Sequence, residues 1–432
     1  MTWRRLLGAL LALMFVGAAV VVALNLRDEG NGTDATSAAV ATQSPPDLVA
    51  RGEYLTRAGN CMGCHTARGG APFAGGRGIE TPFGTVYAPN LTPDPQSGLG
   101  GWSAADFWRA LHNGRSRDGR LLYPAFPYPN YTRVVRADAD AMYAYLRSLP
   151  PVARANTPHE VGFPYNLQAS LAVWRALYFA PGVYRPDPAR SADWNRGAYL
   201  VEGLGHCNAC HSARNALGSQ AGPLDLAGGL IPVQNWYAPS LTSADEASVA
   251  DWEPRHVIDL LKTGVSARGV VAGPMTEVVL NSTQYLSEPD LAAMATLLKA
   301  LPVTRSVRPE ASGARPAAPT DAQVRGAKLY DTHCVQCHGE KGEGVPGAYP
   351  ALAGSRAVTM DSPANMVHVV LQGGFPPSTR GNPRPFGMPP FATVLGNDEV
   401  ADLLTYIRSA WGNRGAPVTA LDASRFRTDG RP

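Results

Sequence analysis

All six cysteines of this 432-residue chain lie in three short motifs of one form, Cys-x-x-Cys-His. The motifs occupy residues 61–65, 207–211 and 334–338. Because every cysteine belongs to a motif, none is left over for a disulfide or for a separate nucleophile. The pattern therefore predicts three sites of the same kind, one at each motif.

The spacing within each motif is typical of covalent attachment of haem c. The two thiols form thioethers with the porphyrin, and the adjacent histidine binds the iron. Zinc would need four ligands per site. A zinc site therefore does not readily explain three identical motifs that each place a histidine directly after the second cysteine. We predict three covalently bound haem c groups, attached through Cys61, Cys64, Cys207, Cys210, Cys334 and Cys337, with the irons bound by His65, His211 and His338.

The sequence around the motifs also repeats. An Arg-Gly-x-x-Leu segment precedes each motif, at residues 51–55, 196–200 and 325–329. Tyr-Ala-Pro-x-Leu-Thr follows the first two motifs, at residues 87–92 and 237–242. An apolar helix is expected to close each unit, at residues 139–149, 289–301 and 398–411. This self-similarity predicts three copies of one small helical domain, in which the glycine of the Arg-Gly segment lets the closing helix approach closely.

We expect an all-α fold of three tandem class I cytochrome c domains, each built around its haem, after an N-terminal transmembrane helix. The predicted domains are residues 47–150, 194–302 and 321–412. The predicted connections are an interdomain segment at 151–193 and a linker at 303–320, with a tether at 27–46 and a polar tail at 413–432. Residues 166–179 form an apolar stretch that is expected to pack between the first two domains or against a partner.

The N-terminal segment predicts export and membrane attachment. Residues 6–26 carry no charge and are long enough to cross ~30 Å of hydrocarbon as a helix. A secretory signal has a shorter apolar region of ~7–15 residues and a small-residue cleavage site, which this run does not offer convincingly. Arg4 and Arg5 before the run place the N-terminus in the cytoplasm. We predict an anchor, residues 1–26, that holds the chain at the periplasmic face of the inner membrane, with a cleaved signal as the alternative.

The sixth iron ligand of an electron-transfer haem is usually methionine in cytochromes c. Met388 stands in a Gly-Met-Pro-Pro strap 50 residues after His338, and we predict that it binds the third iron. Met275 stands in a Gly-Pro-Met strap 64 residues after His211, and we predict that it binds the second. Its rival Met294 falls on the closing helix and is expected to belong to the core.

The first unit departs from this pattern. Its strap, Tyr-Pro-Ala-Phe-Pro-Tyr, holds Phe126 where methionine is expected, 61 residues after His65. Met142 aligns with Met294 and is a poor substitute. His112 is a tentative ligand, and the alternatives are that it is an exposed residue at a helix end or that the iron site is open or holds water. We predict that the first haem lacks His/Met ligation and has a lower potential than the other two.

Composition excludes other classes of protein. A net charge of +3 over 432 residues is too small for a nucleic-acid-binding surface. No nucleotide-binding loop, nucleophile elbow or acidic pair stands out in the sequence. We therefore predict no catalytic residues in this chain.

With these motifs in place, the chain resembles the tri-haem cytochrome c subunits of bacterial membrane-bound dehydrogenases. The resemblance covers roughly residues 47–412 and includes Trp-Asn-Arg-Gly at 194–197 and Tyr-Leu-Val-Glu-Gly-Leu-Gly-His-Cys at 199–207. It implies a subunit without a substrate site of its own. Such a subunit takes electrons from a separate catalytic dehydrogenase subunit and delivers them to ubiquinone or a terminal oxidase.

The resemblance also bears on the catalytic partner. The Pro-Ala-Phe-Pro-Tyr strap at 124–128 is more similar to subunits that accompany molybdopterin dehydrogenases of aldehydes or N-heterocycles. Subunits of quinoprotein alcohol dehydrogenases and flavin sugar dehydrogenases usually carry methionine there, and they are the alternative. Two further classes stay open at this point, namely a haem enzyme with an open first iron site and a free-standing cytochrome c carrier.

Overall fold

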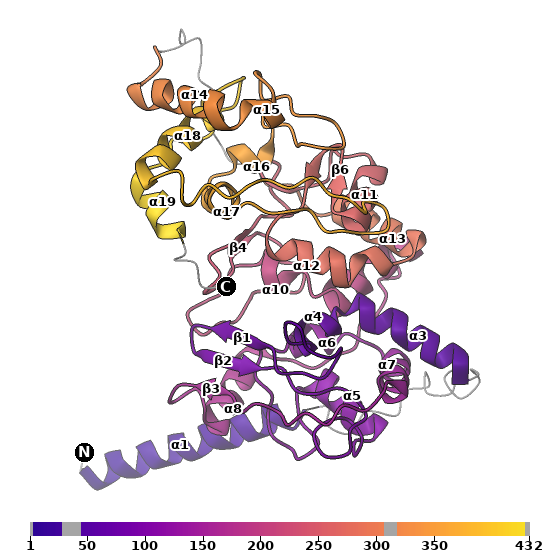
Figure 1. Ribbon diagram of the computed structural model, residues 1–432. Coiled ribbons are helices and arrows are strands. Elements are labelled where there is room, and N and C mark those ends of the chain that lie inside the picture. Colours follow the sequence, from indigo (N-terminus) through magenta and orange to yellow (C-terminus); the bar gives the residue numbers. More distant parts are fainter. Residues whose placement is uncertain (1–2, 28–44, 306–317, 428–432) are drawn as a thin grey trace. The chain divides into compact units, whose positions relative to one another are not determined.

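The fold is described from a computed structural model of the chain, for residues 3–27, 45–305 and 318–427 (Figure 1). The chain divides into two compact units. Unit 1 comprises Met1–Pro188, Tyr199–His206 and Asn215–Ser219, and unit 2 comprises Ala189–Ala198, Cys207–Arg214 and Gln220–Pro432. Most of the predicted tether at 27–46 and of the predicted linker at 303–320 lies outside the described residues.

Unit 1 combines helices with one small sheet. Its helices are α1 (Trp3–Asn25), α3 (Pro45–Ala58), α4 (Cys61–His65), α5 (Ala104–Asn113), α6 (Tyr128–Tyr131), α7 (Arg136–Ser148), α8 (Gln168–Tyr178) and the π-helical η1 (Tyr199–Leu204). Its strands β1 (Gly78–Thr81), β2 (Gly84–Tyr87) and β3 (Glu160–Val161) form an antiparallel sheet in the order β1-β2-β3. Because β3 and α8 lie in unit 1, most of the segment predicted to join two domains packs on the first of them.

Unit 2 is also mostly helical. Its helices are α9 (Ala192–Ala198), α10 (Asn208–His211), α11 (Pro254–Thr263), α12 (Pro274–Asn281), η2 (Thr283–Tyr285), α13 (Glu288–Lys299), α14 (Asp321–His333), α15 (Val335–His338), α16 (Arg356–Thr359), α17 (Ala364–Gln372), α18 (Asn397–Ser409) and α19 (Ala420–Phe426). The strand pairs are β4 (Gly229–Leu230) with β5 (Tyr237–Ala238), and β6 (Val265–Ser266) with β7 (Gly269–Val270). The described residues are thus mostly helical, and extended segments between the helices add short strand pairs.

Local sequence signals fix where several helices begin. In each case a hydroxyl at the N-cap accepts a hydrogen bond from the backbone three residues later, and a side chain there bonds back to the cap. The pairs are Ser103 with Asp106 before α5, Thr320 with Gln323 before α14, and Thr419 with Asp422 before α19. Each cap stabilises its helix by about 1 kcal/mol.

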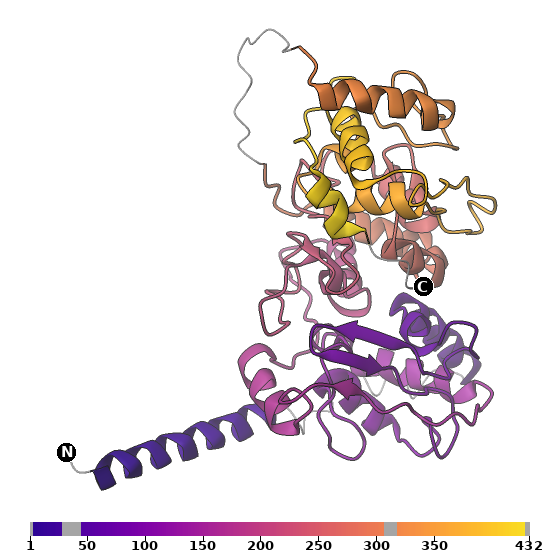
Figure 2. The same cartoon turned by 60° about the vertical axis from the view of Figure 1, so that its left-hand side comes forward.

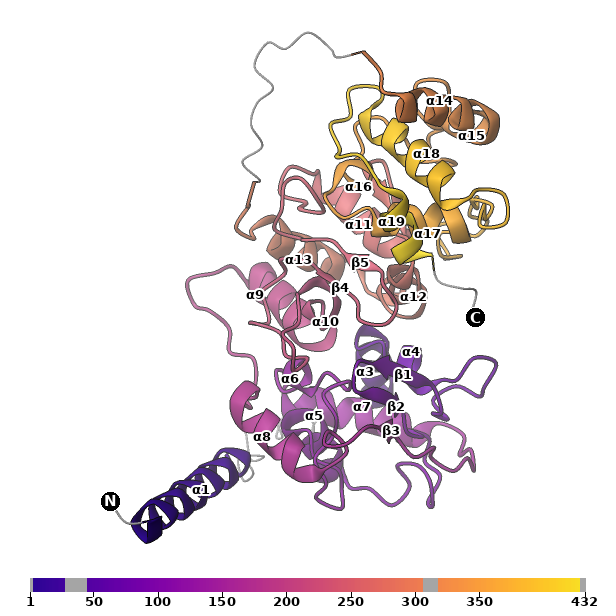
Figure 3. The same ribbon diagram turned by 90° about the vertical axis from the view of Figure 1, so that its left-hand side faces the viewer.

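One helix crossing recurs three times along the chain. The glycine of each Arg-Gly segment lies against a helix that comes after the cysteine motif, so that α3 packs on α7, α9 on α13 and α14 on α18 (Figure 3). A Cβ added to Gly52, Gly197 or Gly326 would lie 1.9, 2.1 or 2.1 Å from a backbone oxygen of that helix. The oxygens belong to Ala141, Ala293 and Asp402, respectively. The expected close approach is therefore present at all three glycines.

An ion pair reinforces each crossing. The arginine before the glycine binds an aspartate on the closing helix, and the partners are Arg51 with Asp138, Arg196 with Asp290, and Arg325 with Asp402. The second and third pairs are bidentate, with both nitrogens 2.6–3.0 Å from carboxylate oxygens. Bidentate pairs fix relative orientation, so these contacts set how the first and last helices of each repeat cross.

The predicted polar tail is wrong for the residues up to 427. Val418, Ala423 and Phe426 are buried in the same core as Leu403 and Leu404 of α18. This region carries apolar side chains on one face of α19, and their burial stabilises the helix against α17 and α18. Val418 and the buried face of α19 are thus part of the C-terminal core, whereas Leu421 stays exposed.

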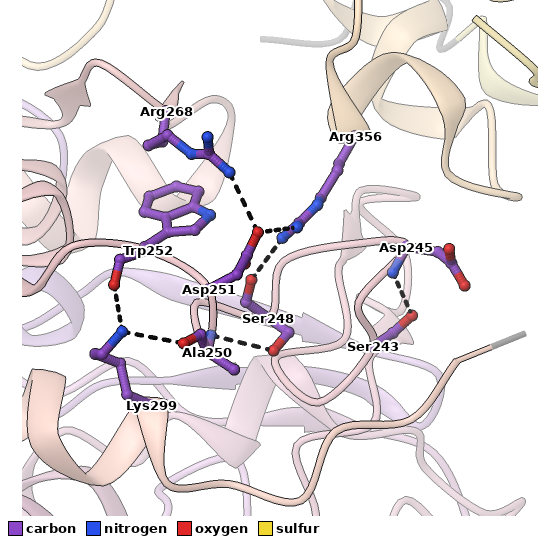
Figure 4. A network of polar contacts seen from close by, with 9 residues as sticks. All are labelled: Ser243, Asp245, Ser248, Ala250, Asp251, Trp252, Arg268, Lys299 and Arg356. Carbon is purple, nitrogen blue, oxygen red and sulfur yellow. Dashed lines mark hydrogen bonds and ion pairs between the residues drawn. The ribbon is translucent and has the colours of Figure 1, made fainter.

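In unit 2 a loop before α11 is held by an arginine from α16 (Figure 4). Arg356 donates to the Ser248 carbonyl at 2.8 Å and to an Asp251 carboxylate oxygen at 2.6 Å. Arg268 reaches the same carboxylate oxygen at 3.3 Å, and Lys299 donates to the Ala250 carbonyl at 3.0 Å. The loop is therefore tied from both sides by cationic side chains.

Arg356→Gln is expected to loosen this loop, seen as faster amide hydrogen exchange at residues 248–252. The hydrogen bond from Arg356 holds the pKa of Asp251 below its usual range. A depressed carboxyl pKa contributes stability that is present above the unfolded value of ~4 and is lost as pH falls through the folded value. Acidification below about pH 4 should therefore mimic the substitution. Arg255→Gln, which removes the exposed pairs of Arg255 with Asp259 and Glu288, is the control and should leave exchange in the loop unchanged.

Candidate haem-binding sites

The three motif histidines have the same hydrogen-bonded environment. The Nδ1 atom of each ring lies within hydrogen-bond distance of a proline carbonyl, at 2.7 Å for His65 and Pro89, 2.7 Å for His211 and Pro239, and 3.0 Å for His338 and Pro350. A carbonyl only accepts, so Nδ1 carries the proton and Nε2 keeps a lone pair for a metal. Burial lowers the pKa of all three rings, which keeps them in the neutral form that binds iron.

The backbone after each motif turns at a glycine. The N–H groups of Gly75, Gly228 and Gly344 each donate to the carbonyl of the motif histidine at 2.8 Å. All three glycines have positive φ angles, of 74°, 84° and 64°. Glycine adopts this left-handed conformation without steric cost, and the turn brings the proline-containing loop under the imidazole.

Burial favours the neutral thiol form of Cys61, Cys207 and Cys334. Burial raises the pKa of Cys61 and Cys207 to about 12 and that of Cys334 to about 11. Reactive and metal-binding cysteines have lowered pKa values instead. Among the residues that the structure describes, no group of three or more His, Cys, Asp or Glu side chains is arranged to hold a metal ion. Two thiols beside a neutral imidazole with Nε2 available are the donor set that haem c requires.

Met388 and Met275, the two predicted iron ligands, are both half-buried. Met388 lies in a strap whose backbone pairs with Gly374 through bonds of 2.8 and 3.0 Å, and its half-buried side chain packs against the C-terminal core. Met275 is half-buried in the first turn of α12. Met294 and Met142 are 4% and 0% exposed and belong to the core, as expected. Ligation of iron by Met275 and Met388 stays a prediction.

The strap of the first repeat, residues 123–128, precedes an aromatic residue that lies near Cys61 and Cys64. The ring of Phe126 is 5.3 Å from that of Tyr131, and the Tyr131 hydroxyl donates to the Gly59 carbonyl at 2.8 Å. Burial raises the pKa of Tyr131 well above its ordinary value, and the nearby Cys61 and Cys64 add to the effect. The segment that contains Phe126 thus brings an aromatic pair toward Cys61 and Cys64.

His112 is not the exposed helix-end residue that one alternative predicted. It is 4% exposed, its ring stacks on Trp108 at 4.5 Å, and its Nδ1 atom lies 3.1 Å from the Thr132 carbonyl. The last turn of α5 faces inward because the chain returns over it at residue 132. Ligation of the first iron by His112 stays a prediction.

Two features of these sites were missed in the sequence. The proline carbonyls that hold the histidines leave a trace only in the repeated Tyr-Ala-Pro of the first two units. The half-buried Arg214, whose buried Nη1 atom has no hydrogen-bond partner while its Nη2 atom donates to the Ala209 carbonyl, follows the second motif closely and suits a haem propionate. Only its spacing from the motif could have suggested it.

Helical repeats that carry carbonyl-bound histidines in Cys-x-x-Cys-His motifs define a c-type cytochrome. The family model for cytochrome c matches residues 49–150 and 323–411. The cytochrome c domains imply covalently bound haem c.

Similarity to named proteins narrows the class from c-type cytochromes to the cytochrome c subunits of dehydrogenases. The chain is 38% identical over 416 residues to the cytochrome c subunit of a quinone alcohol dehydrogenase from Gluconobacter oxydans, covering 91% of this chain and 85% of that one. It is 37% identical over 424 residues to the gluconate 2-dehydrogenase cytochrome c subunit of Pantoea cypripedii, covering 92% and 93%. One of the subunits of a nicotinate dehydrogenase from Pseudomonas putida is 42% identical over 368 residues, which are 84% of this chain and 30% of that protein. The chain belongs to the family of dehydrogenase cytochrome c subunits, which transfer electrons for a catalytic dehydrogenase partner.

Proposed function

We propose that this chain is the tri-haem electron-transfer subunit of a periplasmic dehydrogenase bound to the inner membrane. It takes electrons from a separate catalytic subunit and delivers them to ubiquinone or a terminal oxidase. The observation that carries the proposal is the recurrence of the proline-bound histidine at all three motifs. Three equivalent sites are what a relay needs, whereas a single catalytic haem would need only one.

The protein's own residues hold and shield these sites. Haem c supplies, when bound, an iron that gains and loses one electron. The motif histidines are fixed in one tautomer by their proline carbonyls, and the helix crossings at Gly52, Gly197 and Gly326 hold the walls of each site. Met275 and Met388 would complete the second and third iron sites and raise their potentials. Phe126 leaves the first iron site without a methionine and therefore with a lower potential.

We favour a molybdopterin dehydrogenase of aldehydes or N-heterocycles as the catalytic partner. The Phe126 strap supports this choice, as does the 42% identity to part of a nicotinate dehydrogenase, because nicotinate is an N-heterocycle. A quinoprotein alcohol dehydrogenase or a flavin sugar dehydrogenase is the alternative. The alcohol and gluconate dehydrogenase subunits support it, since they match this chain over 85–93% of their own length.

We further propose that α1 is a retained membrane anchor with its N-terminus in the cytoplasm. Among the described residues it is the one helix long and apolar enough to cross a membrane. The Asn25 side chain at its end accepts from the Arg175 Nε atom at 2.8 Å and donates to the Ala172 carbonyl at 2.9 Å. These hydrogen bonds would be lost if the segment were cleaved, so they favour a helix that is retained in the mature protein.

The function is tested by isolating the full-length chain with a C-terminal tag from detergent-solubilised membranes. We expect a catalytic subunit to co-purify and a haem assay to give three haems per chain. Nicotinate or an aldehyde should reduce the haems of the complex, whereas ethanol and gluconate should not. Reduction by ethanol or gluconate alone would support the alternative partner. A chain that purifies alone and responds to none of these substrates would overturn the proposal.

A further inference from the structure

Helix α8 has one buried stripe and one exposed apolar stripe. Its inward stripe, continuing to the residue after the helix, is Leu171, Arg175 and Phe179, all buried. Its outward stripe is Ala169, Val173 and Leu177, all exposed. Both stripes follow the four-residue spacing of one helical face. The inward stripe packs on unit 1, where the Arg175 guanidinium lies over the rings of Tyr128 and Phe179.

The outward face of α8 continues into the loop before it. We call these residues the α8 apolar face: Phe163, Tyr165, Leu167, Val173, Leu177 and Tyr178, between 37% and 79% exposed. Between residues 162 and 180 the sequence holds a single charged side chain, and that is the buried Arg175. Exposed apolar surface of this extent without charge marks an interaction site rather than ordinary surface.

The end of α1 is fastened to this same helix. Asn25 is 7% exposed and binds Ala172 and Arg175 of α8, while Arg115 donates to the Asn25 carbonyl at 3.1 Å. Beyond this point α1 projects away from the rest of unit 1 (Figure 2). The position of α8 relative to the last turn of α1 is therefore fixed by hydrogen bonds.

The length of α1 places that last turn at the membrane surface. Its 23 residues make a helix of ~34 Å at ~1.5 Å per residue. Hydrocarbon is ~30 Å thick, and the polar headgroup regions bring the whole bilayer to ~40–45 Å. A helix that spans the hydrocarbon thus ends within the headgroup region, and α8 contacts it there. Tyrosine is enriched at this depth, and the α8 apolar face carries Tyr165 and Tyr178.

We propose that the α8 apolar face lies on the lipid bilayer, in its interfacial layer, beside the point where α1 emerges. The proposal rests on α1 being a retained anchor. An uncharged apolar helix face of this kind binds by burying its side chains at the boundary between headgroups and acyl chains. The consequence is that the first haem domain is held on the membrane in one orientation, rather than hanging from a flexible tether.

The test uses the full-length haem-loaded protein in nanodiscs of phosphatidylcholine and phosphatidylglycerol. The photoreactive residue p-benzoylphenylalanine replaces Leu177 in one preparation and Leu421 in the other. Leu421 is the matched control, because it is an exposed leucine on α19 in the other unit. After illumination, intact-protein mass spectrometry should show a lipid adduct at position 177 and none at position 421. Absence of a lipid adduct at 177, or cross-linking of 177 to another protein instead, overturns the proposal.

A second variant and an extraction assay separate the possible failures. Val173→Asp with Leu177→Asp should speed amide exchange of residues 163–178 in the nanodisc while leaving the haem spectra unchanged, and unchanged exchange would contradict the proposal. Alkaline carbonate extraction reports on α1 alone. Release of the chain would overturn both the proposed anchor and this inference. A retained chain without lipid contact at position 177 would overturn this inference only.

Discussion

Replacing Gly326 with alanine is expected to destabilise the C-terminal domain by about 3 kcal/mol, the upper range for overpacking a tight contact. The added Cβ would lie 2.1 Å from the Asp402 carbonyl oxygen and 2.7 Å from the Tyr406 Cβ atom. Relief requires α14 and α18 to move apart, because the obstacle is backbone rather than the end of a flexible side chain. For a domain of this size the midpoint of thermal unfolding should fall by on the order of 10 °C.

Differential scanning calorimetry of the full-length chain measures this effect. Gly222→Ala is the control, since a Cβ at that position meets no atom within 4 Å. It should leave all transitions in place, whereas Gly326→Ala should lower one of them and leave those of unit 1 unchanged. Equal midpoints for the two variants would show that the crossing tolerates a side chain and that the repeated glycine has another cause.

Replacing Met388 with alanine is expected to lower the potential of one haem by on the order of 0.1 V, within the range that axial ligands set. Methionine raises the potential of a c-type haem, so its loss should shift the third component of a redox titration downward. The near-infrared absorption of methionine-ligated ferric haem should fall by the share of one haem. The lowest component, which we assign to the first haem, should not move.

The control for this variant is a methionine that lies in the core. Met294→Leu changes a 4% exposed side chain on α13 and should leave every potential and the near-infrared band as they are. Electron paramagnetic resonance of the oxidised protein gives an independent count of the His/Met sites. Three identical His/Met signals in the unaltered protein, or no change on removing Met388, would contradict the assignment.

The sequence allowed the helix crossings to be predicted because each glycine carries its own context. Gly52 and Gly326 each follow an arginine, 9 and 8 residues before the first cysteine of a motif, and the repeat shows that the position matters. The partners of those arginines were not predicted. Asp138 and Asp402 lie on different turns of helices that the motif alone does not align, so only the packed helices reveal the pairs.

The sequence motifs name the candidate cysteines and histidines, but they do not reveal the backbone carbonyls that hold the histidine rings. A backbone carbonyl leaves no side-chain signature, and its distance along the chain varies, from 24 residues for His65 to 12 for His338. The interpretation of His112 as an exposed residue was wrong for a related reason. A histidine at the end of an amphipathic helix reads as exposed until the segment around Thr132 is seen to cover it.

The arginine–aspartate pairs also have a consequence for how the chain matures. In each repeat the arginine precedes the cysteine motif and its aspartate follows the motif, so that arginine and aspartate are 87, 94 and 77 positions apart along the chain. The cysteines are therefore synthesised well before the helix that closes the repeat. Haem can thus be attached before the repeat is fully folded. The last helix then packs on the first helix and completes the fold of that repeat. Each repeat contains its own arginine–aspartate pair, so we expect the repeats to fold independently and in order from the N-terminus.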